Sequence, residues 1–228
     1  MQIRATNPED KELRRETILD AAEQLWLSQP ERMANIAEIA TVAGLAKGTV
    51  YLYFRSKEEL FLALHQRHVE DFFQRVLDRA QQPASMTMED MLPILKAFLL
   101  DTPAFLPLAS LCHGLMERHL PLEVAFAFEE HIHAILNVLV TALQTHFPLM
   151  TQAVMLQSYA LMLGLWQLLR PTPLKQLMKE RELICACTDD YWFMLEHALR
   201  ALWRGALTPE EQNDANNPPS LPIPITQP

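Results

Sequence analysis

Residues 35–61 hold two short helical patterns on either side of a glycine, and no other stretch constrains the fold of this chain as strongly. Asn35 can cap the first helix, with a glutamate three residues later in the position of a capping box. Apolar residues then recur at helical spacing until Gly44 supplies the left-handed residue that ends the helix. The pattern predicts helices over 36–43 and 47–53 joined by a tight turn, which is a helix-turn-helix.

The second of these helices keeps polar-tipped side chains on or beside its outer faces. Val50 and Phe54 fall on its inward face. The side chains left outside are Lys47, Thr49, Tyr51 and Tyr53. Between residues 42 and 57 the basic side chains occur without an acidic one, although the whole chain has a net charge of −9. This chemistry indicates a helix that enters a DNA major groove with phosphate contacts beside it. An ordinary helical hairpin is the alternative.

The same stretch resembles the DNA-binding signature of the tetracycline-repressor-like (TetR/AcrR) family of bacterial transcription regulators. The run that carries the resemblance is AEIATVAGLAKGTVYLYFRSKEELF, and the match covers roughly residues 14–64. The resemblance implies base contacts from Lys47 and Thr49, base or backbone contact from Tyr51, phosphate contacts from Tyr53 and Lys57, and close backbone approach at Gly48.

Two positions depart from the family pattern. Ala46 stands where the family commonly has a capping serine, which weakens the cap of the reading helix. Asn35 stands where the family often has threonine or serine, and it keeps the capping chemistry. We therefore include Asn35 among the residues expected at DNA, with the details of its phosphate contact left open.

Composition predicts a nearly all-α protein, because the chain has 50% hydrophobic residues, only five glycines and few alternating runs of β-formers. We expect a helix-turn-helix domain over residues 1–56 that opens with a helix over 8–28. A long helix should then join it to a helical effector-binding and dimerisation domain over 57–206. The proline-rich segment 207–228 is expected to be a disordered tail.

Several functional classes find no support in the sequence. Cys112, Cys185 and Cys187 are too few to staple a chain of this length, which fits a reducing compartment. No signal peptide, membrane span, glycine-rich phosphate loop or nucleophile elbow is recognisable. We therefore expect a soluble cytoplasmic protein that is not an enzyme and has no cofactor, bound metal or membrane partner.

The second domain is rich in methionine and aromatic side chains, which usually form a core but also suit a cavity for varied apolar ligands. The resemblance implies such an effector pocket. The residues predicted to line it are Phe98, Phe105, His113, Met116, Tyr159, Met162 and Trp166.

A homodimer is expected because one short reading helix contacts too few bases for specificity. The last two long helices are the predicted interface, with a four-helix seam that uses Leu156, Ala160, Leu163, Phe193, Leu199 and Trp203.

The sequence thus favours a dimeric regulator, a repressor, that binds a palindromic DNA operator and is released by a small lipophilic effector. Two alternatives stay open. The chain could be a helical interaction protein that has kept the motif. It could also be a metal-dependent sensor that binds an ion through His131, His133 or the cysteines.

Overall fold

The structure is a computed structural model of the chain that describes residues 8–29, 32–182 and 190–207, with the backbone alone for residues 115–117. These residues form ten helices and no strand, so the predicted all-α fold is confirmed. Residues 208–228 of the predicted tail lie outside the described part, as do Cys185 and Cys187.

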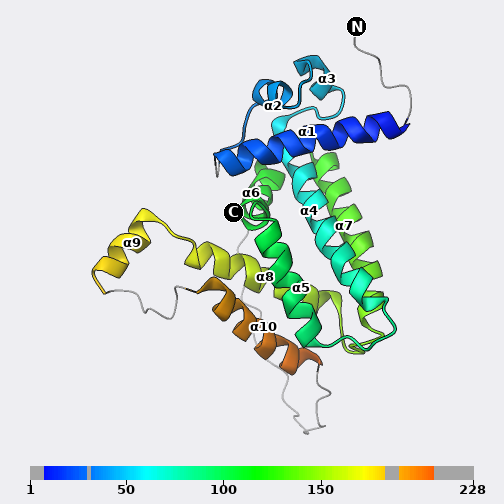
Figure 1. The fold of residues 1–228 in the computed structure, drawn as a ribbon, viewed down its shortest axis with the longest axis vertical. Helices are drawn as coiled ribbons and strands as arrows, with labels where there is room; N and C mark the ends of the chain where they lie inside the picture. The colour runs from blue at the N-terminus through cyan, green and yellow to red at the C-terminus, as the bar shows by residue number, and fades with distance from the viewer. Residues whose placement is uncertain (1–7, 30–31, 183–189, 208–228) are drawn as a thin grey trace.

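The helices divide into a small group at one end of the molecule, a long connector and a larger body (Figure 1). The small group is α1 (Pro8–Ser28), α2 (Ile36–Val42) and α3 (Lys47–Tyr51), and the connector is α4 (Lys57–Ala80). The body contains α5 (Met88–Asp101), α6 (Phe105–Arg118), α7 (Leu122–Leu143), α8 (Gln152–Leu169), α9 (Pro173–Glu180) and α10 (Tyr191–Leu207). Helix α7 lies along α4, and α10 lies along α8 (Figure 1).

Local capping chemistry sets the helix-turn-helix as the sequence predicts. The Asn35 side-chain oxygen accepts hydrogen bonds from the N–H groups of Ala37 and Glu38 at 2.9 and 3.1 Å. The Glu38 carboxylate in turn accepts the Asn35 N–H at 2.8 Å, which completes the capping box. Gly44 has φ of 65° and ends this segment in the left-handed region that glycine tolerates.

Helix α3 is shorter than the predicted 47–53. It ends at Tyr51, because the next two backbone N–H groups bond to carbonyl oxygens three residues back, at 3.1 and 3.0 Å. This tightens the last turn toward 3₁₀ geometry. Ala46 makes no side-chain cap at the start of the helix, as its methyl group dictates.

One hydrophobic cluster joins the three N-terminal helices to the rest of the chain. It includes Trp26 of α1, Val50 of α3, Phe61 of α4 and Leu108 of α6, all of which are buried. The Trp26 and Phe61 rings have centroids 5.5 Å apart. Packing is therefore continuous across the boundary predicted between residues 56 and 57, and the start of α4 belongs to the core of the first three helices.

A cluster of ion pairs holds α1 against α4 nearly two turns beyond Phe61. The Arg67 guanidinium donates hydrogen bonds to Glu16, Asp20 and Glu23 of α1 at 3.0, 2.6 and 2.8 Å. His68 Nε2 lies 2.8 Å from the other Glu23 oxygen. The carboxylates of α1 thus converge on two adjacent residues of α4, which fixes the angle between these helices.

The body is held by two further apolar clusters, one at the far end of α4 with α7, α8 and α10, and one between α4, α5, α6 and α10. Helix α7 is long and apolar enough by composition to span a membrane. It packs along α4 and carries Glu129 and Glu130 in its middle, so we assign it to the helical body. Helix α9 projects from the end of α8 and has no buried residue (Figure 1).

Truncation of Phe61 should destabilise the whole protein, because this ring is fully buried where α1 meets α4. We expect Phe61→Ala to lower the free energy of unfolding by about 3–5 kcal/mol. Leu13→Ala, at an exposed position of α1, should change it by less than about 0.5 kcal/mol. Urea unfolding at equal protein concentrations measures both, and similar values for the two variants would contradict the shared core.

The Glu23 carboxylate should stabilise the protein only where it is ionised. Its hydrogen bond to His68 is the main cause that holds its pKa below the ordinary 4.5, against the opposing effect of burial. The contribution of Glu23 is therefore complete above pH 4.5 and is lost as the pH falls through the lowered pKa. Glu23→Gln should destabilise the protein at pH 7 and have a smaller effect at pH 3.5. Parallel urea unfolding checks this, with Glu12→Gln as the exposed control, and an effect independent of pH would contradict it.

Candidate DNA-binding surface and ligand cavity

The exposed side of α3 carries three residues of the predicted DNA-binding set. Lys47 and Gly48 are exposed, Tyr51 exposes 47% of its surface, and Lys47 Nζ lies 5.8 Å from the centroid of the Tyr51 ring. A Cβ added at Gly48 would meet no atom within 4 Å, so the backbone there is open to close approach by a large partner. The structure brings a cation, an aromatic ring and an open backbone onto one surface.

The other four residues of that set are more constrained. Thr49 and Tyr53 are half-buried, and Tyr53 packs against the cluster that contains Phe61. The Asn35 oxygen is engaged in the cap of α2, which leaves only its amide N–H₂ for another partner. Lys57 is half-buried at the start of α4, and its ammonium lies 3.9 Å from the Glu58 carboxylate. At this distance the pair is weak, so the Lys57 ammonium stays available.

Two exposed residues beside this surface are absent from the predicted set. Arg55 follows α3 and is exposed, and it belongs to the run between residues 42 and 57 that lacks acids, so a signal for it was present in the sequence. Leu52 is 83% exposed. The helical pattern over 47–53 gives no reason to single it out.

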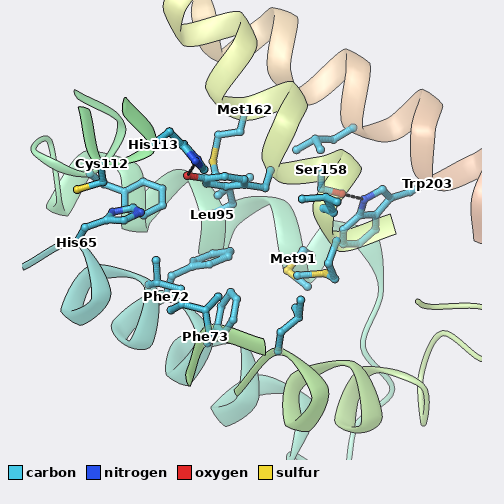
Figure 2. A pocket seen from close by; sticks show the side chains of 18 of the residues that line it. His65, Phe72, Phe73, Met91, Leu95, Cys112, His113, Ser158, Met162 and Trp203 are labelled. Carbon is cyan, nitrogen blue, oxygen red and sulfur yellow. Dashed lines mark hydrogen bonds between the residues drawn. The ribbon is translucent and has the colours of Figure 1, made fainter. Parts of the chain in front are cut away.

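A cavity of about 220 Å³ lies in the body between α4, α5, α6, α7, α8 and α10 (Figure 2). His65, Cys112 and His113 lie at one end of it, and Ser158 and Trp203 at the other (Figure 2). Most of the remaining wall is apolar, with Val69, Phe72, Phe73, Met88, Met91, Leu92, Leu95, Phe128, Ile132, Leu136, Met155 and Leu199. An apolar cavity with a few polar groups is typical of a site for a small organic ligand.

The predicted ligand-binding residues fall into three groups. Phe105, His113, Tyr159 and Met162 line the cavity. Phe98 does not, because it is fully buried behind Phe105, with ring centroids 4.9 Å apart. Trp166 lies instead on a separate hollow of about 300 Å³ with Tyr191 and Trp192. The Met116 side chain lies outside the described residues.

The predicted dimer residues also divide. Leu156, Ala160 and Phe193 are exposed and Leu163 is half-buried, so these four positions can reach a partner. Leu199 and Trp203 cannot, because both are buried within the protomer. The Trp203 indole N–H donates to the Ser158 hydroxyl at 2.9 Å, which turns this face of α10 toward α8. Leu199 and Trp203 are thus core residues of the protomer, and the predicted seam stays a prediction that the other four positions are free to make.

The polar groups of the cavity wall differ in their partners. The His113 and Tyr159 side chains are hydrogen bonded at 3.1 Å, and the Cys112 thiol donates to the Phe61 carbonyl at 3.8 Å. Burial raises the pKa of Cys112 to about 12 and also raises the pKa of Tyr159, so both groups are neutral at pH 7. His65 is 4% exposed, and its Nδ1 has no partner. The predicted set omits His65, because a lone histidine within an apolar stripe gives no signal of its burial.

The histidines proposed for a metal sensor have other surroundings. His131 Nε2 lies 2.6 Å from Glu70 and joins α7 to α4, while His133 is exposed. Throughout the described ranges, no three histidine, cysteine, aspartate or glutamate side chains lie close enough to share a metal ion.

Two curated relatives share part of this sequence. The Fatty acid metabolism regulator protein of Bacillus subtilis is 31% identical over 83 residues, which are 36% of this chain and 43% of that protein. The HTH-type transcriptional repressor NemR of Escherichia coli is 36% identical over 67 residues, which are 29% of this chain and 34% of that protein. The match therefore covers less than half the length of either relative.

A solved structure extends the likeness to the whole fold. The fatty acid degradation regulator FadR from Bacillus halodurans superposes with a TM-score of 0.51 at 21% identity, covering 83% of this chain and 98% of that one. Two family profiles match the sequence itself. "Bacterial regulatory proteins, tetR family" matches residues 18–64, and "Tetracyclin repressor-like, C-terminal domain" matches residues 66–210. Because these profiles cover the helix-turn-helix and the helical body after it, the chain belongs to the TetR family of DNA-binding transcription regulators and is not an enzyme.

Proposed function

We propose that this protein is a cytoplasmic, homodimeric repressor that binds a palindromic operator and releases it when a small lipophilic molecule enters the cavity. The observation that carries the proposal is one helix, α4, that packs against the helix-turn-helix at its start and lines the apolar cavity further along. A ligand that changes the position of this helix changes the position of α3.

The surface on α3 supports DNA as the partner. Lys47 and Tyr51 offer a charged donor and a stacking ring on the second helix of the motif, which is the helix that lies in the major groove in helix-turn-helix proteins. Arg55 and Lys57 stand beside them for the phosphates, without an acidic residue in the run between residues 42 and 57. The net charge of −9 belongs mostly to the rest of the chain, and salt screens such distant charges beyond about 8 Å.

The small size of α3 supports a dimer. A helix over Lys47–Tyr51 contacts few base pairs, so two copies about 34 Å apart are needed to read a useful site. Leu156 on α8 and Phe193 on α10 are exposed apolar side chains, and Ala160 is exposed one turn after Leu156. These side chains offer a surface for a second copy. Two such helices from each protomer would form a four-helix seam.

The cavity supports control by a lipophilic effector. Its wall is almost entirely aliphatic, aromatic or methionine side chains, so entry of an apolar molecule removes apolar surface from water. An effector that favours a dimer with the wrong spacing of the two α3 helices by about 1–3 kcal/mol would lower operator affinity by roughly 5- to 150-fold. This difference between the two states is sufficient for a switch.

Substitutions on the α3 surface should weaken operator binding while the protein stays folded. We expect Tyr51→Ala to lower affinity for the DNA upstream of the protein's own coding sequence. Lys57→Ala should lower the slope of log affinity against log salt by about one to two units per dimer, because each lost phosphate contact releases about one fewer counterion.

Fluorescence anisotropy with a specific and a nonspecific duplex measures both effects. The unsubstituted protein should bind the specific duplex more than ~10³-fold tighter. Lys96→Ala, an exposed lysine on α5, serves as the matched control and should leave the salt slope unchanged. An unaltered slope for Lys57→Ala would remove Lys57 from the interface. A reporter gene under the same DNA tests the sign of control, since deletion of a repressor raises expression.

A charge placed on the proposed seam should separate the protomers. Phe193 is 62% exposed, and a carboxylate in its place would have to be buried against the partner. We expect Phe193→Glu to be monomeric at concentrations where the unsubstituted protein is dimeric, as measured by analytical ultracentrifugation. Leu100→Glu, on the exposed face of α5, is the control for an added charge and should stay dimeric. A dimeric Phe193→Glu variant would place the interface elsewhere.

A further inference from the structure

His65 is a polar group in the cavity wall that the protein leaves without a partner. The ring belongs to α4 and lies between two aromatic side chains, with centroids 5.6 Å from Phe105 and 6.1 Å from Phe128. Neither ring nitrogen is hydrogen bonded to another described residue. Nδ1 is fully enclosed by the protein, so Nε2 is the nitrogen that a ligand in the cavity would contact. An imidazole that is buried without a hydrogen bond costs free energy, so a native protein seldom keeps one without a use for it.

Four other polar groups of the wall, on His113, Tyr159, Ser158 and Cys112, are hydrogen bonded within the protein. His113 and Tyr159 bond to each other, and Ser158 donates to the Val154 carbonyl at 2.8 Å while it accepts the Trp203 N–H. Among the described residues of the wall, His65 is therefore the buried polar side chain that lacks a hydrogen bond, whereas Glu129 is exposed.

The charge state of His65 restricts what such a ligand can be. Burial is the main cause that lowers its pKa to about 3, with His68 and His113 adding to the effect, so the imidazole is neutral at pH 7. A neutral imidazole offers one donor and one acceptor. Glu129 is the acidic residue of the wall, and it is exposed on α7. An ion held at His65 would therefore lose its hydration without gaining an opposite charge beside it.

We propose that the effector is an uncharged molecule with an apolar body and one hydroxyl or carbonyl group, which is hydrogen bonded to His65. This inference rests on the proposed control by a ligand in the cavity. The cavity runs from the His65 end to Ser158 and Trp203 (Figure 2), and the apolar body of the ligand would lie along this direction. The volume of about 220 Å³ corresponds to roughly seven groups the size of a water molecule, at about 30 Å³ each, which limits the effector to a small molecule.

The position of His65 also connects the ligand to the DNA-binding end. Three residues further along α4, His68 is bonded to Glu23 of α1, and Arg67 between them holds three carboxylates of the same helix. A ligand that engages His65 therefore acts within one turn of the contacts that set the angle of α1. The hydrogen bond to His65 thus determines which ligand binds. A shift of the same turn of α4 would change the position of α1 through Arg67 and His68.

The test compares three eight-carbon probes that differ only in their polar group, namely 1-octanol, octanoate and octylammonium, by isothermal titration calorimetry at pH 7.5 with the full chain. We expect 1-octanol to bind at least about tenfold more tightly than either ion, because neither ion is compensated at His65. His65→Leu should weaken 1-octanol binding by about five- to tenfold, the weight of one hydrogen bond. His65→Gln, which keeps a donor and an acceptor, should retain most of the affinity.

Thermal unfolding of both variants shows whether each is folded, and the Gln variant keeps the test valid if the Leu variant is not. If octylammonium bound most tightly, the proposal would be overturned, and the polar group of the ligand would instead be a cation that contacts Glu129. Equal affinity of His65→Leu and the unsubstituted protein for 1-octanol, or no binding of any probe, would also overturn it. Operator affinity measured with and without 1-octanol is a separate result, since a probe that binds through His65 but leaves the operator bound contradicts the release mechanism alone.

Discussion

Burial of the first turns of α4 is the constraint on which the rest of the structure depends. Leu60, Phe61 and Leu64 are fully buried in one cluster with α1, α2, α3 and α6. Interiors of this kind are packed as densely as organic crystals, so the helix-turn-helix cannot rotate without moving α4. On the polar side of α4, the ion pairs of Arg67 hold the same helix to α1 as well. Two different interactions thus make α1 and the start of α4 one rigid unit.

The remainder of α4 has different surroundings. From His65 to Phe73 several of its side chains line the cavity instead of a filled core. Helices α5, α6, α7, α8 and α10 complete the wall, so each of them is sensitive to what the cavity contains. The same helix therefore belongs to the DNA-binding end through its first turns and to the ligand-binding body through the turns that follow.

Much of the fold follows from local chemistry that the sequence displays. Asn35 and Gly44 delimit α2 as expected, because a cap and a left-handed glycine need only their immediate neighbours. Which face of a later helix turns toward the core depends on contacts with residues far away in the sequence. For these helices the sequence is therefore a weaker guide. Trp203 has the apolar character of an interface residue, yet its bond to Ser158 turns it into the core. His65 could not be recognised from sequence, since only the folded structure shows that its ring has no partner.

The cavity has a mechanical consequence for the protein without ligand. A void in an otherwise dense interior makes the unfolded state smaller in volume than the folded one, so hydrostatic pressure acts against the folded state in proportion to that void. It also makes the body more compressible than the cluster around Phe61. The protein thus joins a stiff region to a compliant one through a single helix, and a ligand that fills the void stiffens the compliant region.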